Sequence, residues 1–393
     1  MQRILVNIAS LQHEHILYPW LRILKVFQSR GCEIYVNAGP FVKKLEPIGN
    51  VYSFRWLSPE ENKLLEKGKT ATKIGFMFHS LWRNLAVLKN SRKILAQNNF
   101  DLVYTPSSVL DFVVYPYWLK ITGKKIKWAT TLANVVPRKD EGNKFIRLLA
   151  WLFFRISLLM IRKADVIFAS TQEIGDYLLA KKFAPKKVVL TGFAVENDLI
   201  EKAQADPKYN IDALFVGRIN ETKGIFDMLK VLNLVKEKYP DFQLVIMGEG
   251  DATTKKKFQR KIKETGLENN VQFLGYKNGM EKYNIVKSAK CFWFLSVSAS
   301  ESFGVALLEA VCSGIPAFAY DLPQFRRLYP NSEVDISPKG DYEKVAQKVL
   351  ELFESGNFQN FKGGKLLGKY SWEKIAEIEY GRIKHSFIVF IKN

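Results

Sequence analysis

The chain has 393 residues, a length typical of two or three domains rather than one. Hydrophobic residues make up 47% and charged residues 25%, which excludes a disordered, collagen-like or disulfide-dense chain. The charge is unusual, because 59 basic against 39 acidic side chains give a net +20. The first 200 residues hold 30 of the basic and 15 of the acidic side chains, so we expect this half to face an anionic partner.

The cysteines and histidines indicate neither a disulfide framework nor a structural metal site. Cys32, Cys291 and Cys312 lie far apart and form no Cys-x-x-Cys pair, which fits a reducing compartment. The histidines include one close pair, His13 and His15, which we interpret as part of a surface loop. The apolar run at the start is too short for a signal peptide, so the sequence predicts a cytoplasmic protein.

Short apolar runs alternate with longer helical patterns along the first half of the chain. The expected strands are 4–8, 33–37, 102–105, 127–131 and 166–170. The expected helices are 18–29, 74–97, 109–121, 144–162 and 172–181. Such alternation predicts a parallel sheet with crossover helices, and we assign residues 1–196 to a Rossmann-like N-terminal domain.

The pattern restarts after the polar stretch 196–209, which shows no apolar periodicity and which we interpret as a linker. The strands expected beyond it are 213–216, 243–247, 271–274, 291–295, 317–319 and 333–336. The sequence thus predicts a second doubly wound α/β domain over 210–370. A last helical segment, 371–393, is expected to pack back towards the N-terminal domain. Ligands of such sheets bind beyond the carboxyl ends of the strands, so chemistry is expected there.

One candidate site lies where the expected strand 291–295 leads into a helix. The helix opens at about Phe303 with Ser302 as its N-cap, and Gly304 lets a ligand approach the backbone closely. The free N–H groups of Ser302 to Val305 therefore predict a cradle for a diphosphate.

Two glutamates accompany this cradle. Glu301 precedes the helix, and Glu309 lies about two turns inside it among apolar neighbours. Such carboxylates need hydrogen-bond donors, which sugar hydroxyls would supply. The alternative is that Glu301 caps the helix and that Glu309 is solvated.

A second candidate site follows the expected strand 213–216. Arg218 falls at the carboxyl end of that strand, and Lys223 falls at the start of the next helix, where it opposes the helix dipole. Two cations beside a phosphate cradle would neutralise a diphosphate leaving group. The alternative is that these cations only pair with Glu221 and Asp227.

Together these residues resemble a known family. The motifs, in chain order, are Gly217-Arg218, Lys223-Gly224, Gly248-Glu249-Gly250, Gly275-Tyr276, residues 301–304, Glu309-Ala310 and Gly314-Ile315-Pro316. Their order and spacing resemble the retaining GT-B glycosyltransferases of family 4. The N-terminal half resembles this family more loosely, through Thr130-Thr131, residues 164–170 and Thr191-Gly192-Phe193.

The resemblance implies an α/β protein of GT-B architecture, with two Rossmann-like domains facing across a cleft. It also implies transfer of a sugar from a nucleotide-diphosphate donor with retention at the anomeric carbon. Glu301 would orient the donor sugar, while Arg218 and Lys223 would hold the diphosphate. Further donor-binding positions are Gly217, Glu249, Gly275, Tyr276, Ser302, Phe303, Gly304, Val305 and Glu309. The family's chemistry uses no divalent ion and no cofactor besides the sugar nucleotide.

The sequence departs from the family at two positions. The Gly-rich loop that usually follows the first strand is replaced by residues 9–15, which contain no glycine. The histidine that often follows the strand matching 127–131 is absent, and Asn134 is the nearest polar substitute on the acceptor side. Because this loop is altered, an alternative is that the chain is a catalytically silent relative that binds nucleotides or scaffolds an assembly.

Two features of the basic half favour an acceptor at a membrane. The segment 144–162 has a narrow cationic stripe on an apolar circumference, which is typical of an interfacial helix. The flanking strands favour the alternative, a domain helix that is buried apart from its arginines. A basic and aromatic cluster would attract anionic head groups, and it consists of Lys63, Lys67, Lys69, Lys73, Phe76, Phe78, Trp82, Arg83, Lys89, Arg92 and Lys93.

We therefore expect a lipid-linked or surface-glycan acceptor, reached by a peripheral protein at the cytoplasmic face of an anionic membrane. A rival from another class is a nucleic-acid-binding protein, which the net charge and the 13% aromatic residues would suit. No recognised nucleic-acid module is present, and that rival leaves Glu301 and Glu309 unexplained. We therefore expect no nucleic-acid partner.

Overall fold

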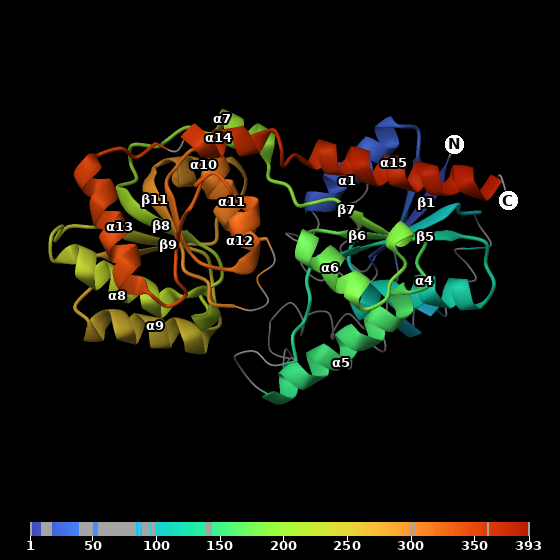
Figure 1. Cartoon of the computed structure of the whole chain (residues 1–393), viewed down its shortest axis with the longest axis horizontal. Coiled ribbons are helices and arrows are strands. Elements are labelled where there is room, and N and C mark those ends of the chain that lie inside the picture. Colours follow the sequence, from blue (N-terminus) through green and yellow to red (C-terminus); the bar gives the residue numbers. More distant parts are fainter. Residues whose placement is uncertain are drawn as a thin grey trace. The chain divides into compact units, whose positions relative to one another are not determined.

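The computed structural model of the chain describes the following residues: 2–8, 18–38, 50–53, 84–85, 87–88, 95, 99–138, 144–298, 301, 303–359 and 361–391. The chain divides into two compact units (Figure 1). Unit 1 comprises residues 1–193 and 372–393, and unit 2 comprises residues 194–371. Each unit is an α/β fold built on a parallel sheet.

Unit 1 has a sheet of seven strands, counted within its described residues, in the order β3-β2-β1-β4-β5-β6-β7. The strands are β1 (Arg3–Ile8), β2 (Glu33–Ala38), β3 (Asn50–Ser53), β4 (Leu102–Thr105), β5 (Lys127–Leu132), β6 (Val166–Ala169) and β7 (Val188–Leu190). The helices are α1 (Tyr18–Ser29), α4 (Leu110–Ile121), α5 (Lys144–Ile161), α6 (Gln172–Ala180) and α15 (Trp372–Ile391). Figure 1 shows α1 and α15 on one face of the sheet and α4 and α5 on the other.

Unit 2 has a sheet of six strands, as far as the structure describes it, in the order β10-β9-β8-β11-β12-β13. The strands are β8 (Ile211–Val216), β9 (Leu244–Met247), β10 (Val271–Gly275), β11 (Ala289–Phe294), β12 (Ala317–Tyr320) and β13 (Asp335–Ser337). The helices are α7 (Asn197–Lys202), α8 (Ile225–Lys236), α9 (Ala252–Glu264), α10 (Gly279–Lys287), α11 (Val305–Cys312), α12 (Pro323–Leu328), α13 (Tyr342–Ser355) and α14 (Phe361–Leu367). Helices α8, α9 and α13 cover one face of this sheet (Figure 1).

The central strands of both sheets are buried apolar runs, because a parallel sheet is covered by helices on both faces. In unit 2 this packing centres on Trp293 of β11, which stacks on Phe242 with ring centroids 5.8 Å apart. The expected strands at 102–105, 166–170 and 317–319 coincide with β4, β6 and β12 to within one residue. Most of the expected helix 74–97 lies outside the described residues.

The segment 196–209, which we interpreted as a linker, belongs to unit 2 in the structure. It contains the short helix α7, which packs on α10. Beyond α7, the backbone N–H of Gln204 donates to Asn284 and that of Asp206 donates to Ser288, at 3.0 and 2.8 Å. These bonds to the last turn of α10 and to the residue that follows it hold a polar stretch that has no apolar periodicity of its own. The two units divide earlier in the chain, after Phe193.

Helix α5 differs from our prediction, based on the flanking strands, of a domain helix that is buried apart from its arginines. Its inner side packs on α4 and enters the core of unit 1 through Phe154, Leu158 and Ile161. Its outer side leaves five large apolar side chains exposed, so the expectation that mainly the arginines meet solvent was wrong. Within the described ranges, no helix is long and apolar enough to cross a membrane.

A buried carboxyl group joins the C-terminal helix α15 to the sheet of unit 1. The Tyr104 hydroxyl of β4 donates to Glu379 of α15, with Oη and Oε2 2.8 Å apart. Both side chains are almost fully buried, and this burial raises the pKa of Glu379 to about 8 and also raises the pKa of Tyr104. By contrast, Glu377 on the same helix forms an exposed ion pair with Arg30 at 2.6 Å.

We expect the free energy of unfolding to fall as the pH rises from about 5 to about 8. The folded state keeps a proton on Glu379 at pH values where the unfolded chain, with its ordinary pKa of 4.5, has lost it. The stabilisation is therefore complete below about pH 4.5 and is lost as the pH rises through about 8. Glu379→Gln should flatten the profile by roughly 3 kcal/mol over this range in urea denaturation.

Glu377→Gln is the matched control for this experiment, because it removes an exposed carboxylate from the same helix. This variant should keep the slope of the wild-type profile. Parallel pH profiles for the wild type and Glu379→Gln would contradict the assignment of the slope to the buried carboxyl group.

Candidate functional site

The residues of the candidate site gather where three strands of unit 2 end. Strand β8 leads into Gly217 and Arg218, β9 leads into Gly248 and Glu249, and β11 leads into Leu295. The strand ends approach one another so closely that side chains are excluded. A Cβ at Gly248 would lie 1.9 Å from the carbonyl oxygen of Gly217. The glycines of the motif are therefore required for this close contact between backbones.

A second close contact places Lys223 beside β11. Gly224 follows Lys223 and adopts a left-handed conformation with φ of 75°. A Cβ at Gly224 would lie 1.9 Å from the carbonyl oxygen of Leu295. The neighbouring Thr222 carbonyl accepts a hydrogen bond from the backbone N–H of Val297 at 2.9 Å. The turn before α8 is thus anchored to the end of β11.

The two candidate constellations meet in one ion pair. Lys223 Nζ lies 2.5 Å from Glu301 Oε2, although the residues are 78 positions apart. The Ser296 hydroxyl lies 3.1 Å from the same carboxylate oxygen. The side chains of Lys223 and Glu301 are only 22% and 12% exposed, so water screens this pair less than a surface pair. The backbone carbonyl of Glu301 accepts a hydrogen bond from the side-chain amide of Gln324 at 2.8 Å, which fixes the loop that carries Glu301.

Neither Arg218 nor Lys223 pairs with the two acidic residues that the alternative interpretation gave them as partners. Glu221 pairs with Lys257 at 2.6 Å, and Asp227 pairs with Lys230 at 2.9 Å. Arg218 is exposed and forms no hydrogen bond or ion pair in the part of the chain that the structure describes. A guanidinium has five N–H donors in a fork that matches phosphate oxygens, so Arg218 is available to an anionic ligand.

The start of α11 lies next to this ion pair. Gly304 precedes the helix with φ of 66°, and a Cβ there would lie 3.5 Å from the ring of Phe294. Lys223 Nζ lies 5.5 Å from the centroid of the same ring. The first N–H groups of a helix attract anions, which suits the cradle predicted there. Phe303 itself is buried against Tyr370, whereas Ser302 lies outside the described residues.

Glu309 is held by two residues that the sequence analysis missed. Its carboxylate accepts from Lys282 Nζ at 2.5 Å and from Tyr283 Oη at 2.7 Å, both on α10. Glu309 is 7% exposed, so it is not the solvated residue of the alternative interpretation. Burial and the adjacent carboxylate raise the pKa of Tyr283. The sequence indicated only that Glu309 needs hydrogen-bond donors. No motif or spacing in the sequence shows that α10 supplies them.

The other predicted donor-binding residues lie nearby on the same unit. Gly275 has φ of 67°, and a Cβ there would lie 3.3 Å from Glu249 Oε1, so these two residues are neighbours. Glu249 also pairs with Lys255 at 3.0 Å. Tyr276 is 56% exposed, which leaves much of its ring accessible.

The remaining predictions concern unit 1. Asn134 lies just after β5 and is exposed. The pair His13 and His15 lies outside the described residues, and so does the basic and aromatic cluster of 63–93. Those interpretations therefore stay predictions.

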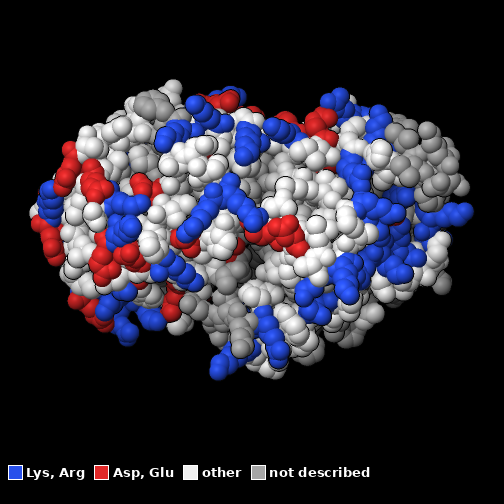
Figure 2. Space-filling model, in the orientation of Figure 1, with Lys and Arg blue, Asp and Glu red and all other residues white. Residues whose placement is uncertain are grey.

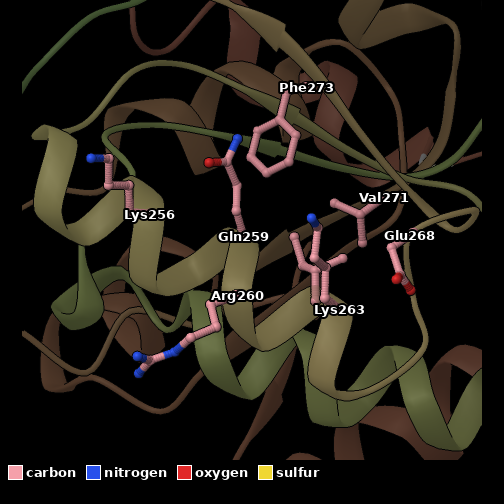
Figure 3. A pocket seen from close by; sticks show the side chains of 8 residues that line it. Lys256, Gln259, Arg260, Lys263, Glu268, Val271 and Phe273 are labelled. Atoms are coloured by element: carbon pink, nitrogen blue, oxygen red, sulfur yellow. The ribbon is translucent and has the colours of Figure 1, made fainter.

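A hollow of about 540 Å³ lies on unit 2 between α9 and β10 (Figure 3). Its lining residues are Lys256, Gln259, Arg260, Ile262, Lys263, Glu268, Val271 and Phe273. Figure 3 shows that α9 contributes most of these side chains. None of them belongs to the predicted site, which gathers instead at the carboxyl ends of the strands.

Comparison with protein families gives a match within this unit. Residues 196–361 match the family described as Glycosyl transferases group 1. The phosphatidyl-myo-inositol mannosyltransferase of Mycobacterium tuberculosis H37Rv is 34% identical over 179 residues, which cover 43% of this chain and 46% of the relative. An uncharacterized glycosyltransferase of Methanocaldococcus jannaschii is 28% identical over 309 residues, covering 73% and 71%. The chain thus spans about half the length of the mannosyltransferase relatives it matches.

Solved structures show the fold of both units. Anabaena HepE in complex with UDP has a TM-score of 0.71 and 14% identity, covering 98% of this chain and 100% of that chain. Sucrose-phosphate synthase from Thermosynechococcus elongatus has a TM-score of 0.72 and 15% identity, covering 99% and 100%. The predicted GT-B architecture, with two Rossmann-like units, is confirmed.

The close contact at Gly224 gives a test of this geometry. We expect Gly224→Ala to lower the free energy of unfolding by at least about 2 kcal/mol more than Gly266→Ala. Both glycines have positive φ, but a Cβ at Gly266 meets nothing within 4 Å, so the difference isolates the contact with Leu295. Chemical denaturation of the two variants measures it. Equal losses of stability would contradict the close approach of the turn before α8 to the end of β11.

Proposed function

Residues 196–361 are a glycosyl transferases group 1 domain, and on this basis we propose that the chain transfers a sugar from a nucleotide-diphosphate sugar with retention of anomeric configuration. The observation that carries the proposal is the contact of Lys223 with Glu301 on the unit where Arg218, among the described residues, has no hydrogen bond or ion pair. This arrangement combines cations for a diphosphate with a carboxylate for a sugar. Bound UDP in the structurally similar HepE supports a nucleoside diphosphate as the ligand class.

The cations act on the leaving group in this proposal. Arg218, Lys223 and the first N–H groups of α11 bind the diphosphate and stabilise the negative charge that grows as the sugar departs. Lys223 reaches the diphosphate by exchanging its carboxylate partner for a phosphate oxygen. Glu301 then has an oxygen free for the hydroxyl groups of the donor sugar, while Ser296 keeps its side chain oriented.

Glu309 binds the ribose hydroxyls of the donor. Two donors already contact its carboxylate, but an ionised carboxylate has about four acceptor sites. Lys282 and Tyr283 therefore act as positioning residues that orient Glu309 without exhausting it. Glu249, Gly275 and Tyr276 lie near the nucleobase in this assignment, and the backbones of Gly217, Phe303, Gly304 and Val305 border the phosphates.

The chemical step exchanges one bond to the anomeric carbon for another on the same face. The bond between this carbon and the diphosphate oxygen breaks, and the acceptor oxygen forms the new bond. The departing diphosphate oxygen accepts the proton of the acceptor hydroxyl. The protein stabilises the diphosphate and an oxocarbenium-like sugar more strongly than the bound substrate, which is the source of the rate enhancement.

We propose a lipid-linked or surface-glycan acceptor that is reached at the inner face of an anionic membrane. Two relatives are named for lipids, which supports this class: the phosphatidyl-myo-inositol mannosyltransferase and the GDP-mannose:cellobiosyl-diphosphopolyprenol alpha-mannosyltransferase of Xanthomonas campestris. The net +15 of the first 200 residues provides the charge for such a surface. On the face drawn in Figure 2, Lys and Arg predominate over the described part of unit 1, whereas both signs of charge mix over unit 2. Asn134 is the proposed acceptor-side residue.

Donor hydrolysis tests the role of the ion pair. We expect Lys223→Ala and Glu301→Gln each to lower the rate of nucleoside-diphosphate release by about 100-fold or more, because each removes a charge that acts in the transition state. Lys257→Ala is the control, since it removes an exposed lysine near the same turn. A panel of sugar nucleotides identifies the donor first. Lys223→Ala/Glu301→Ala, which leaves neither charge unpaired, separates a loss of folding from a loss of chemistry.

Several outcomes would contradict this function. A wild type that binds a sugar nucleotide but never hydrolyses or transfers it would indicate the catalytically silent relative. Thermal stabilisation by oligonucleotides and by no sugar nucleotide would indicate the nucleic-acid-binding rival. Full activity of both single variants would remove the ion pair from the mechanism.

We also propose that the transfer needs no divalent ion, because Arg218, Lys223 and α11 supply the positive charge at the diphosphate. Treatment with EDTA should leave the initial rate of transfer within about twofold of the untreated rate. Added Mg²⁺ or Mn²⁺ should also have little effect. A rate that collapses in EDTA and returns with Mn²⁺ would contradict this proposal.

A further inference from the structure

Helix α5 carries a continuous exposed stripe of apolar side chains. Its members and their exposures are Phe145 57%, Leu148 39%, Leu152 41%, Ile156 43% and Leu159 63%. At 100° per residue these five positions fall within about 80° of the helix circumference. The opposite side of the helix is the one that packs into unit 1 through Phe154, Leu158 and Ile161. The stripe therefore faces away from the unit's own core along the whole helix, which is about 27 Å long.

The charged residues of α5 itself are all basic. Residues 142–164 contain five cations and no acidic residue. Lys144 and Arg155 are exposed and lie within about 40° of one edge of the stripe. Arg155 and Arg138 both contact the ring of Trp151, with guanidinium carbons 5.5 and 5.4 Å from its centroid. Tryptophan flanked by cations is typical of the boundary between water and lipid.

We infer that α5 lies in the interface of a membrane that contains anionic lipid, with the stripe among the acyl chains and the flanking cations at the head groups. The inference rests on the proposed function and extends it, because it names the element that holds unit 1 next to a lipid-linked acceptor. The contact itself needs neither donor nor acceptor. It can therefore be tested, and can fail, independently of sugar transfer.

Charge favours the membrane over a second copy of the chain as the occupant of the stripe. A two-fold dimer through α5 would bring each helix against itself, because such an interface joins the same patch of both subunits. Lys144 and Arg155, which flank one edge of the stripe, would then lie close to the same two cations of the other copy. Anionic head groups present the opposite charge along the whole helix.

A fluorescent label at Ile156 reports directly on insertion. The three native cysteines are all buried, and burial raises the pKa of each thiol, that of Cys312 to about 12. A new cysteine in Ile156→Cys is thus the reactive one. With an environment-sensitive dye, we expect a blue shift on vesicles of phosphatidylcholine with about one third phosphatidylglycerol, and a much smaller one on phosphatidylcholine alone. Leu179→Cys on α6, which has the same 43% exposure, should show no shift.

Co-sedimentation with the same vesicles measures the contribution of single side chains. Leu152→Ser should weaken binding of the full-length chain about tenfold, while Leu179→Ser should bind like the wild type. Arg155→Gln should weaken binding to the anionic vesicles about fivefold. Donor hydrolysis without vesicles should be unchanged in Leu152→Ser, since α5 is not part of the donor site.

Three results would overturn the inference. The first is a wild type that does not bind the anionic vesicles, and the second is equal binding by Leu152→Ser. The third is a label at position 156 that is already shielded in buffer in a chain that sediments as a dimer, which would assign the stripe to a second copy. Matching thermal melts for the wild type and the variants exclude misfolding as the cause of lost binding.

Discussion

The site of unit 2 depends on two close approaches of the backbone: the end of β8 meets the end of β9, and the turn before α8 meets the end of β11. The carbonyl oxygens of Gly217 and Leu295 occupy the places where side chains of Gly248 and Gly224 would begin. The second approach places the turn that carries Lys223 next to the end of β11, and Lys223 lies 2.5 Å from Glu301 across 78 residues of sequence. The glycines and the charged residues of the motif are therefore parts of one arrangement, in which the backbone contact sets the position of the ion pair.

The ion pair also explains how unit 2 tolerates a cation at a helix start. Lys223 stands just before α8, where the helix dipole disfavours positive charge. Glu301 compensates for it without a ligand, and Ser296 and Gln324 hold that glutamate and its loop. A diphosphate would replace the glutamate as partner of the lysine. The site is thus stable in the folded chain and still offers Arg218 and the start of α11 to an anion.

The sequence predicts those parts of the fold that depend on local patterns. Buried strands such as β4 and β12 are apolar runs, and the strand-end glycines mark where the chain turns. Strand β7 is only three residues long and half exposed, so its pattern is weak. The contacts of Glu309 with Lys282 and Tyr283 arise because α10 and α11 pack on the same sheet, which no spacing reveals. Periodicity located the apolar faces of α5, but it cannot tell a face that meets a core from one that meets solvent.

The two units use their positive charge differently. In unit 2, several cations near the site have acidic partners, as the pairs Lys257–Glu221, Lys230–Asp227 and Lys255–Glu249 show. In unit 1, residues 142–164, which include α5, contain five cations and no acidic residue. An exposed apolar stripe is unfavourable in water, and a one-sided excess of charge beside it repels copies of the same chain. Both features become favourable together only at a surface that is apolar inside and negative at its boundary, as an anionic membrane is.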